Sequence, residues 1–434
     1  MNQLYVAVAA IGGLILLLGL VSNLVKTRLW VSEPLVALLA GVALGPHGFG
    51  LLDLFDWGPR EPILEQASRL TLATGLMGAA LRLPDGYPLR HWRPLAVLLG
   101  PLLTAMWLSS SALVWLILRP PILVALLIGA ILTPTDPVVS SSILSGELAD
   151  RCVPGRVRHL LSAASGANDG LGYPFVLLPI LLLIRPPRQA WLHWLSYTLL
   201  WEVGLAVVVG AALGAMAGLL LRWASGRHAT GQTSLLGVTL ALSLTVMGIV
   251  KVMGSDSILA VFVAGVAFNR VAHSDREEEQ EHVQDVVARF FNLPIFVLLG
   301  LAIPWSGWLA LGWSGPLLIV ALLLLRRVPW LWALHGLLTP MRGRRDVLFA
   351  GWFGPIGISA LYYANLGLRE TGLAEVWVVG SLVICASVVA FGVTATPFTR
   401  LYGRDASHME PHPAPHGEHE PMANRLTGDQ ARGT

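Results

Sequence analysis

Long apolar runs recur along almost the whole chain and are separated by short polar segments. A helix needs about 20 apolar residues to cross the hydrocarbon core of a bilayer. The pattern predicts thirteen such helices, over residues 4–24, 33–50, 63–83, 94–118, 121–146, 157–184, 194–221, 233–250, 256–272, 286–303, 312–337, 346–366 and 374–398. The expected fold class is therefore an all-α polytopic membrane protein, with residues 1–406 as the membrane domain. Residues 407–434, rich in His and Pro, are expected to form a disordered cytoplasmic tail.

Composition agrees with a chain that lies in a lipid bilayer. Hydrophobic residues make up 55% of the sequence and charged residues only 13%, whereas soluble domains carry roughly 25% charged residues. The two cysteines, Cys152 and Cys385, are too few for a disulfide framework or a cysteine-rich metal site. The net charge of +3 is small and the basic residues are scattered, so nucleic acid is not an expected partner.

The distribution of Lys and Arg between the loops predicts the orientation, because cytoplasmic loops carry an excess of these residues. Loops after odd-numbered helices, together with the segment after the last helix, hold 17 of them, and loops after even-numbered helices hold 6. The N-terminus is therefore expected outside and the C-terminus in the cytoplasm. Arg exceeds Lys by 27 to 2, which is typical of a GC-rich bacterium, so we expect the bacterial inner membrane.

Two of the predicted helices are interrupted at corresponding positions. The helix over 121–146 contains Pro134 and Pro137, and the helix over 346–366 contains GWFGPIGIS (351–359). Thirteen helices divide into two groups of six offset by seven, and an odd offset reverses the direction of each matched helix. Interrupted helices at matching places in two halves are typical of transporter binding sites. We therefore expect inverted repeats whose two broken helices cross.

Asp136 lies between the two prolines, about 15 residues or roughly 22 Å into its helix. A charged group in hydrocarbon costs a few kcal/mol, and such residues are rare and usually functional. Proline removes backbone donors and unwinds the helix locally, which leaves carbonyl oxygens free beside the hydroxyls of Thr133 and Thr135. This combination favours a small-cation site. The alternative is an aspartate that only caps the broken helix.

A second carboxylate, Asp169, lies about 12 residues or roughly 18 Å into the next, antiparallel helix. Ser165, Asn168 and Asp169 are spaced i, i+3 and i+4, so they share one helical face. The two aspartates are expected to face each other at similar depth and to bind Na⁺ or a related monovalent cation. The alternative is a helix-packing patch with one tolerated aspartate.

Other charged residues lie in or at the ends of apolar runs. Arg326 and Arg327 need anionic partners, and one of them is expected to neutralise the half-helix ends at the two breaks; alternatively both mark the cytoplasmic edge. Asp256 opens the helix over 256–272 and is expected to be its N-cap. The remaining such residues are expected to be interfacial anchors: Glu65, Glu202 and His47.

The stretch LTPTDPVVSSSILSGELADRCVPGRVRHLLSAASGANDGLGYPF (132–175) resembles the monovalent cation:proton antiporter family, specifically the fungal plasma-membrane Na⁺/H⁺ antiporters and their bacterial relatives, with NhaP-type proteins further off. The TDP and GANDG elements carry the resemblance together, since either alone would be weak. The likeness extends over most of the chain, through residues 42–48, 254–269, 290–305, 324–330 and 348–364.

This resemblance implies a thirteen-helix antiporter fold with a dimerisation domain, an elevator-like moving core and a homodimer. It implies site positions at Asp136, Asp169, Thr135, Ser165 and Asn168, and a charge-compensating arginine at Arg326 or Arg327. One position departs from the family pattern. Ala164 stands where the family usually has Glu, four residues before the Asn, which puts cation affinity and selectivity in question.

The expected function is exchange of Na⁺ or Li⁺ for protons, which compete for the buried Asp pair, with no cofactor and no enzymatic activity. Burial disfavours the charged form of a carboxyl, so a proton and a cation can replace each other there. One titratable group in the Asn168–Asp169 pair favours electroneutral exchange. The alternatives of the same fold are K⁺/H⁺ exchange and Na⁺-coupled solute transport. An intramembrane enzyme or a channel is disfavoured, because no histidine lies mid-helix and no repeated pore loop is present.

Overall fold

The computed structural model describes residues 2–24, 31–137, 139–144, 147–226, 235–272, 290–341 and 343–406. Every regular element within these ranges is a helix. The principal helices are α1 (Asn2–Leu24), α2 (Glu33–Leu44), α3 (Arg60–Leu81), α5 (Trp92–Val97), α6 (Leu103–Leu118), α7 (Ile122–Ile131), α10 (Gly155–Ile184), α11 (Pro187–His193), α12 (Gly204–Gly226), α13 (Leu235–Val252), α14 (Ser257–Ala272), α17 (Ser314–Leu325), α18 (Val328–Leu334), α19 (Arg344–Trp352), α20 (Ile358–Thr371) and α21 (Ala374–Ala406). The shorter helices are α4 (Tyr87–Arg90), α8 (Ser141–Leu144), α9 (Glu147–Cys152) and α16 (Trp305–Ala310).

Six helical stretches of the described chain are long and apolar enough to cross a membrane. They are Trp92–Leu118, Gly155–Ile184, Pro187–Ala224, Leu235–Val252, Ser314–Leu337 and Ala374–Arg404. Shorter apolar helices cover Tyr5–Leu18, Glu33–Leu44, Ile122–Ile131, Ser257–Ala272 and Phe290–Leu301. The chain is therefore a multi-pass membrane protein, as predicted.

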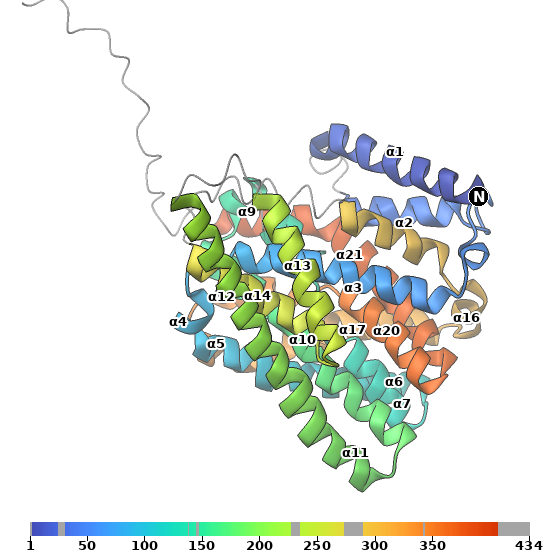
Figure 1. Cartoon of the computed structure of the whole chain (residues 1–434). Helices are drawn as coiled ribbons and strands as arrows, with labels where there is room; N and C mark the ends of the chain where they lie inside the picture. Colours follow the sequence, from blue (N-terminus) through green and yellow to red (C-terminus); the bar gives the residue numbers. More distant parts are fainter. Residues whose placement is uncertain are drawn as a thin grey trace, which may run out of the picture.

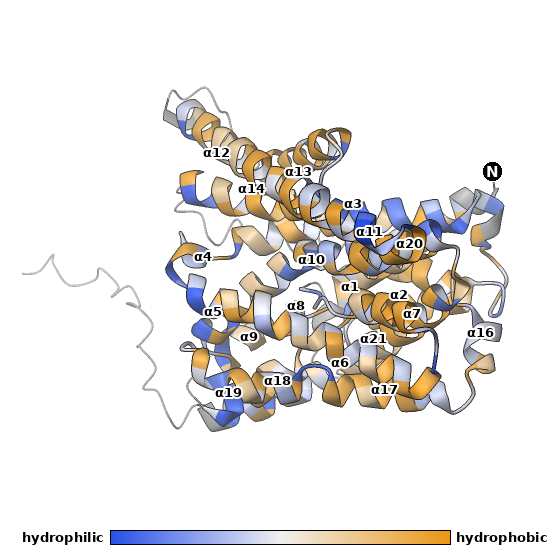
Figure 2. Cartoon of the chain, turned by 90° about the horizontal axis from the view of Figure 1, so that it is seen from below, coloured by the Kyte–Doolittle hydropathy of each residue, from blue (hydrophilic) through white to orange (hydrophobic). Residues whose placement is uncertain are grey.

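The helices are not equally buried. Only 22% of the most apolar window of Pro187–Ala224 is buried inside the protein, against 67% for Ala374–Arg404. An apolar helix that the protein itself leaves uncovered matches a lipid surface, where the backbone groups are already paired within the helix. Figure 2 shows hydrophobic colour along most of the helices and hydrophilic colour in short stretches, among them α4, α11 and α19.

Close helix packing builds the frame around the centre. α14 packs against α12, α13 and α3, while α10 packs against α7, α14 and α20 (Figure 1). Glycine makes the approach of α12 to α14 possible, since a Cβ at Gly214 would lie 2.7 Å from the Cα of Ala264. Gly170 of α10 faces α14 in the same way, 2.7 Å from the Cα of Leu259. Small residues at helix contacts are the usual means of close packing in membranes.

Both predicted helix breaks are present. α7 ends at Ile131, and the described residues from there to Ser140 are non-helical. α19 ends at Trp352 before α20 begins at Ile358. The two breaks touch, because the backbone N–H of Asp136 donates to the carbonyl of Pro355 at 2.9 Å. Prolines in both segments lack the N–H that would continue the helix.

Several element boundaries differ from the prediction, among them the end of the last helix, which continues to Ala406 instead of residue 398. The second helix ends at Leu44 instead of residue 50, because the Gly45–Pro46 step leaves helical geometry. The seventh begins at Pro187 instead of residue 194, and its middle, Trp194–Val203, is π-helical. The acidic run 275–285 and the His- and Pro-rich tail 407–434 lie outside the described residues.

Candidate functional site

The carboxylate of Asp136 is held by the first turn of α20. Its Oδ2 accepts a hydrogen bond from the backbone N–H of Ile358, and its Oδ1 accepts one from Val139 at 3.4 Å. The side chain is fully buried. A Cβ at Gly357 would lie 2.7 Å from the Cγ of Asp136, so only glycine leaves room for the carboxylate there. A helix N-terminus stabilises an anion through its free N–H groups, which fixes Asp136 in place.

Asp169 lies in the middle of α10 and is fully buried. Among the described residues neither of its carboxylate oxygens has a hydrogen-bond partner. Asp136 is its charged neighbour, and the hydroxyl of Ser359 is the polar side chain that lies nearest to forming a hydrogen bond with it. Tyr363 fixes the backbone here, because its hydroxyl donates to the carbonyl oxygen of Asp169. A buried carboxylate without a partner is costly, so this position calls for a proton or a cation.

Three polar side chains tie the broken helix to α10. The backbone N–H of Thr135 donates to Oδ1 of Asn168 at 3.1 Å, and Nδ2 of Asn168 donates to Oγ1 of Thr135 at 2.8 Å. The hydroxyls of Thr135 and Ser165 are hydrogen-bonded at 3.1 Å. The structure therefore brings together all five residues that the sequence assigns to the ion site. The two hydrogen bonds between Thr135 and the amide of Asn168 also fix the distance between the segments that carry Asp136 and Asp169.

Arg326 joins the carbonyl ends of the two breaks. One guanidinium nitrogen donates to the carbonyls of Leu132 and Thr133, the latter at 3.4 Å, and the other donates to the carbonyl of Gly354. These oxygens lie at or just past the C-terminal ends of α7 and α19, where the helix dipole is negative. A cationic side chain thus compensates the carbonyl ends of both breaks.

Arg327 lies beside it, and both arginines are buried, with 3% and 5% exposure for Arg326 and Arg327. α17 ends at Leu325 and α18 begins at Val328, so the helix is interrupted at the two arginines. A Cβ at Gly354 would lie 3.1 Å from the guanidinium carbon of Arg327. Arg327 thus packs against the second break, whereas Arg326 bonds across both.

Asp256 is set apart from the Asp pair. Its Oδ1 accepts from the backbone N–H groups of Ile258 and Leu259 at 3.0 and 3.2 Å, so it caps α14 as the sequence predicts. Its electrostatic neighbours are Glu202 and Lys251. The structure thus groups Asp256 with a different carboxylate.

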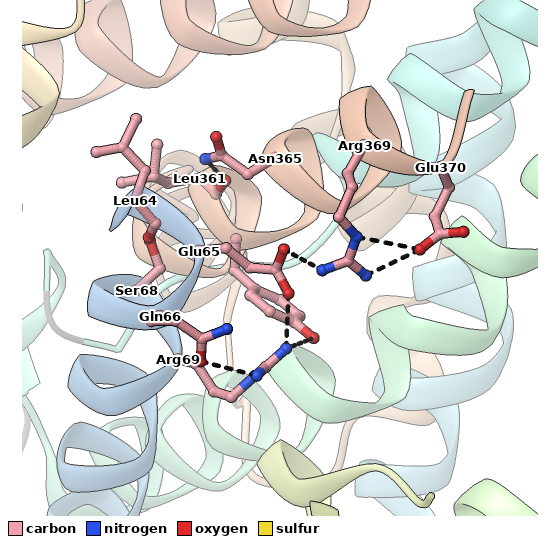
Figure 3. Close-up of polar contacts among 10 residues, drawn as sticks. Leu64, Glu65, Gln66, Ser68, Arg69, Leu361, Asn365, Arg369 and Glu370 are labelled. Atoms are coloured by element: carbon pink, nitrogen blue, oxygen red, sulfur yellow. Dashed lines mark hydrogen bonds and ion pairs between the residues drawn. The ribbon is translucent and has the colours of Figure 1, made fainter. Parts of the chain in front are cut away.

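Two carboxylates that the sequence predicts to be interfacial anchors, Glu65 and Glu202, are buried in the structure. Glu65 is 1% exposed and Glu202 is 8% exposed. Figure 3 shows Glu65 between Arg69, at 2.7 Å, and Arg369 of α20, which itself pairs with Glu370 at 2.8 Å. The i, i+4 spacing of Glu65 and Arg69 was an available signal for this cluster. The position of Glu202, eight residues into an apolar run, was another.

Comparison with known proteins places the whole membrane region in one group. The sequence profile of the family described as "Sodium/hydrogen exchanger, transmembrane" matches residues 13–401. The chain is 35% identical over 373 residues to a protein of Zygosaccharomyces rouxii named Na(+)/H(+) antiporter 2, which covers 84% of this chain and 46% of that protein. It is 29% identical to a Schizosaccharomyces pombe Na(+)/H(+) antiporter, over 90% of this chain and 89% of that protein.

The chain spans less than half the length of the Zygosaccharomyces relative. Among solved structures, the sodium proton antiporter MjNhaP1 from Methanocaldococcus jannaschii superposes with a TM-score of 0.69. The match covers 93% of this chain and 98% of that one at 18% identity. The shared feature is therefore the fold.

Proposed function

The chain belongs to the transmembrane sodium/hydrogen exchanger family, and from that premise we propose that it exchanges a monovalent cation, Na⁺ or Li⁺, for protons at Asp136 and Asp169. The relatives described above are named as antiporters, that is, transporters rather than enzymes. Exchange of this kind needs no cofactor. The cation and the proton are both cargo of the transporter.

The observation that carries the proposal is the state of Asp169. Its two carboxylate oxygens are buried, lack hydrogen-bond partners in the described chain and lie next to a second carboxylate. Two adjacent carboxylates cannot both stay ionised in a dry site unless a positive charge joins them. A proton or a desolvated cation meets this need equally well, which is the condition for competition.

The exchange follows from the different environments of the two aspartates. Asp136 is committed to the N–H groups of Ile358 and Val139, so it stays anionic and fixed. Asp169 binds the cation together with the oxygens of Thr135 and Ser165, and releases it when it takes a proton. One uncommitted carboxyl gives one proton per cation, so the exchange is electroneutral.

The same proposal covers the finer architecture. The eleven apolar stretches, with α3 and the broken α19–α20 pair added, correspond to thirteen membrane helices. We propose that they form inverted repeats whose broken members are α7 and α20. The N-terminus lies outside and the C-terminus in the cytoplasm of a bacterial inner membrane. Two copies form a homodimer, residues 1–406 are the antiporter domain, and residues 407–434 are the cytoplasmic tail.

The test is Asp169→Asn in proteoliposomes carrying a pH-sensitive dye. Asparagine keeps the size of the side chain and removes the charge, so Na⁺-driven proton movement should disappear. Asp150→Asn is the matched control, because Asp150 is an exposed residue paired with Arg158 at the surface, and it should exchange like the wild type. Na⁺-dependent proton release that persists in Asp169→Asn overturns the proposal.

Cation selectivity is tested with Na⁺, Li⁺ and K⁺ in the same assay. K⁺/H⁺ exchange is the second candidate, since the position of the family's Glu holds Ala164 here. Ala164 is buried one helical turn before Asn168, so Ala164→Glu adds an oxygen ligand next to the Thr135–Asn168 pair. We expect this variant to favour the smaller cations. If the wild type prefers K⁺, its function is K⁺/H⁺ exchange.

A further inference from the structure

A second buried carboxylate pair lies outside the ion site. Glu202 belongs to the π-helical stretch Trp194–Val203, and Asp256 is the N-cap of α14. They are 8% and 5% exposed, and in the described chain Oε2 of Glu202 and Oδ2 of Asp256 have no hydrogen-bond partner. The two segments are tied together, because the hydroxyl of Ser255 and the N–H of Asp256, the latter at 3.4 Å, both donate to the carbonyl of Glu202.

This pair is connected to the ion site by two tyrosines. The hydroxyl of Tyr173 donates to Oε1 of Glu202 at 2.9 Å. Tyr173 follows Asp169 by four residues, so it lies on the same face of α10, about 6 Å further along the axis. Tyr363, which binds the backbone of Asp169, has Asp256 as an electrostatic neighbour. Tyr173 therefore links Glu202 to a position on α10 that lies one helical turn from Asp169.

The direction away from the ion site leads to the surface. Lys251, at the end of α13, is an exposed neighbour of both carboxylates. Beyond it, Lys251 interacts with the cluster around Glu65 that Figure 3 shows, and the side chain of Arg369 in that cluster is 45% exposed. The titratable and charged neighbours of the pair are Lys251, Tyr173, Tyr362 and Tyr363. Lys251 in turn neighbours Glu65, Arg69 and Arg369.

The negative charges of Glu202 and Asp256 are not fully compensated by their neighbours. Glu65 is neutralised by its own arginines, and the tyrosines are neutral donors. Lys251 offsets one of the two carboxylates, partly screened by water. One uncompensated negative charge remains between two buried oxygens that lack a donor. Two buried, interacting carboxyl groups with one excess negative charge favour binding one proton.

We propose that Glu202 and Asp256 hold one proton between them and supply it to Asp169 from the Arg369 end of the protein. When the cation leaves Asp169, the proton leaves the pair and binds a carboxylate oxygen of Asp169. The pair then carries one more negative charge and takes a proton from the water at the Arg369 end. This role rests on the proposed function, since it supplies the proton that competes with the cation. A second cation site is the rival occupant, and counting the Na⁺ bound per chain distinguishes the two.

The first test measures the proton directly, by infrared difference spectroscopy of the purified full-length protein on a pH change. The wild type should show the carbonyl band of a protonated carboxyl group, and Glu202→Gln and Asp256→Asn should each lose it. Asp256→Asn keeps the helix cap, because asparagine caps as well as aspartate. Asp169→Asn should retain this band, so the outcome does not depend on whether exchange occurs. A wild-type spectrum without a band that these two substitutions remove overturns the proposal.

The second test measures exchange in oriented proteoliposomes while pH is varied on one face. Glu202→Gln and Asp256→Asn should shift the half-maximal proton concentration about tenfold or more when pH changes at the Arg369 face. Half-saturation by Na⁺ should be unchanged. Glu370→Gln is the control, since Glu370 is an exposed partner of Arg369, and it should match the wild type. Equal shifts on both faces, or binding of a second ²²Na⁺ per chain that Glu202→Gln removes, overturn the proposal.

Discussion

Replacing Gly357 with alanine would displace the anchored carboxylate of the ion site without removing any charge. The Cβ of the new residue would lie 2.7 Å from the Cγ and 2.9 Å from the Cβ of Asp136, whereas ordinary contacts begin at 3.4 Å. The carboxylate must therefore retreat by at least the 0.7 Å difference at its Cγ. Asp136 has little freedom to do so, because its own N–H is bonded to Pro355.

The retreat would break the hydrogen bond from the N–H of Ile358 to Oδ2 of Asp136. A hydrogen bond to a charged group contributes about 1.5–3 kcal/mol. Each 1.4 kcal/mol corresponds to a factor of ten in affinity. If the whole loss falls on the cation-bound state, the half-saturating Na⁺ concentration should rise by about 10- to 100-fold.

The assay is Na⁺-driven proton movement in proteoliposomes over a range of Na⁺ concentrations. Gly248→Ala is the matched control, because a Cβ at Gly248 of α13 would meet nothing within 4 Å. Thermal unfolding of both variants in detergent separates a change at the site from loss of the fold. Wild-type half-saturation in a folded Gly357→Ala protein would refute the idea that the Ile358 N–H positions Asp136 for the cation.

Two further substitutions test the framework of the site. Arg326→Gln removes the charge that bonds the carbonyl ends of both breaks, so it should lower the free energy of unfolding by about 3 kcal/mol or more and abolish exchange. Arg327→Gln should destabilise the protein less. The Tm of each purified variant is the measurement, and equal losses would contradict the assignment. Thr135→Val removes the oxygen that accepts a hydrogen bond from Asn168 at 2.8 Å, so it should raise the half-saturating Na⁺ concentration about tenfold. Thr135→Ser keeps the hydroxyl and should stay close to the wild type. Equal behaviour of the two variants would refute the role of the hydroxyl.

Local sequence patterns were sufficient to predict the composition of the candidate ion site. Pro134 and Pro137 predict the break in which Asp136 lies, and the i, i+3, i+4 spacing places Ser165, Asn168 and Asp169 on one face. These signals work because each depends only on residues within one turn or one break. The GPIG segment at 354–357 predicts the second break for the same reason.

The partners across the fold could not be predicted. The donor that holds Asp136 is the N–H of Ile358, 222 residues away, and nothing in either local sequence pairs the two. Glu65 lies near the start of its predicted helix, where solvent contact is the default, and Glu202 was interpreted in the same way. Their burial depends on how α20, α10 and α13 pack around them, which periodicity does not encode. The choice between Arg326 and Arg327 likewise depended on which side chain faces both breaks.

The most direct measurement of the central claim is proton release on cation binding. Na⁺ is added to the purified protein in weak buffer with a pH-sensitive dye, while bound ²²Na⁺ is counted. The account predicts about one proton released per Na⁺ bound, because a ligand carboxyl must lose its proton to bind a metal, and neither binding nor release in Asp169→Asn. Na⁺ binding without proton release, or release that survives in Asp169→Asn, would contradict it.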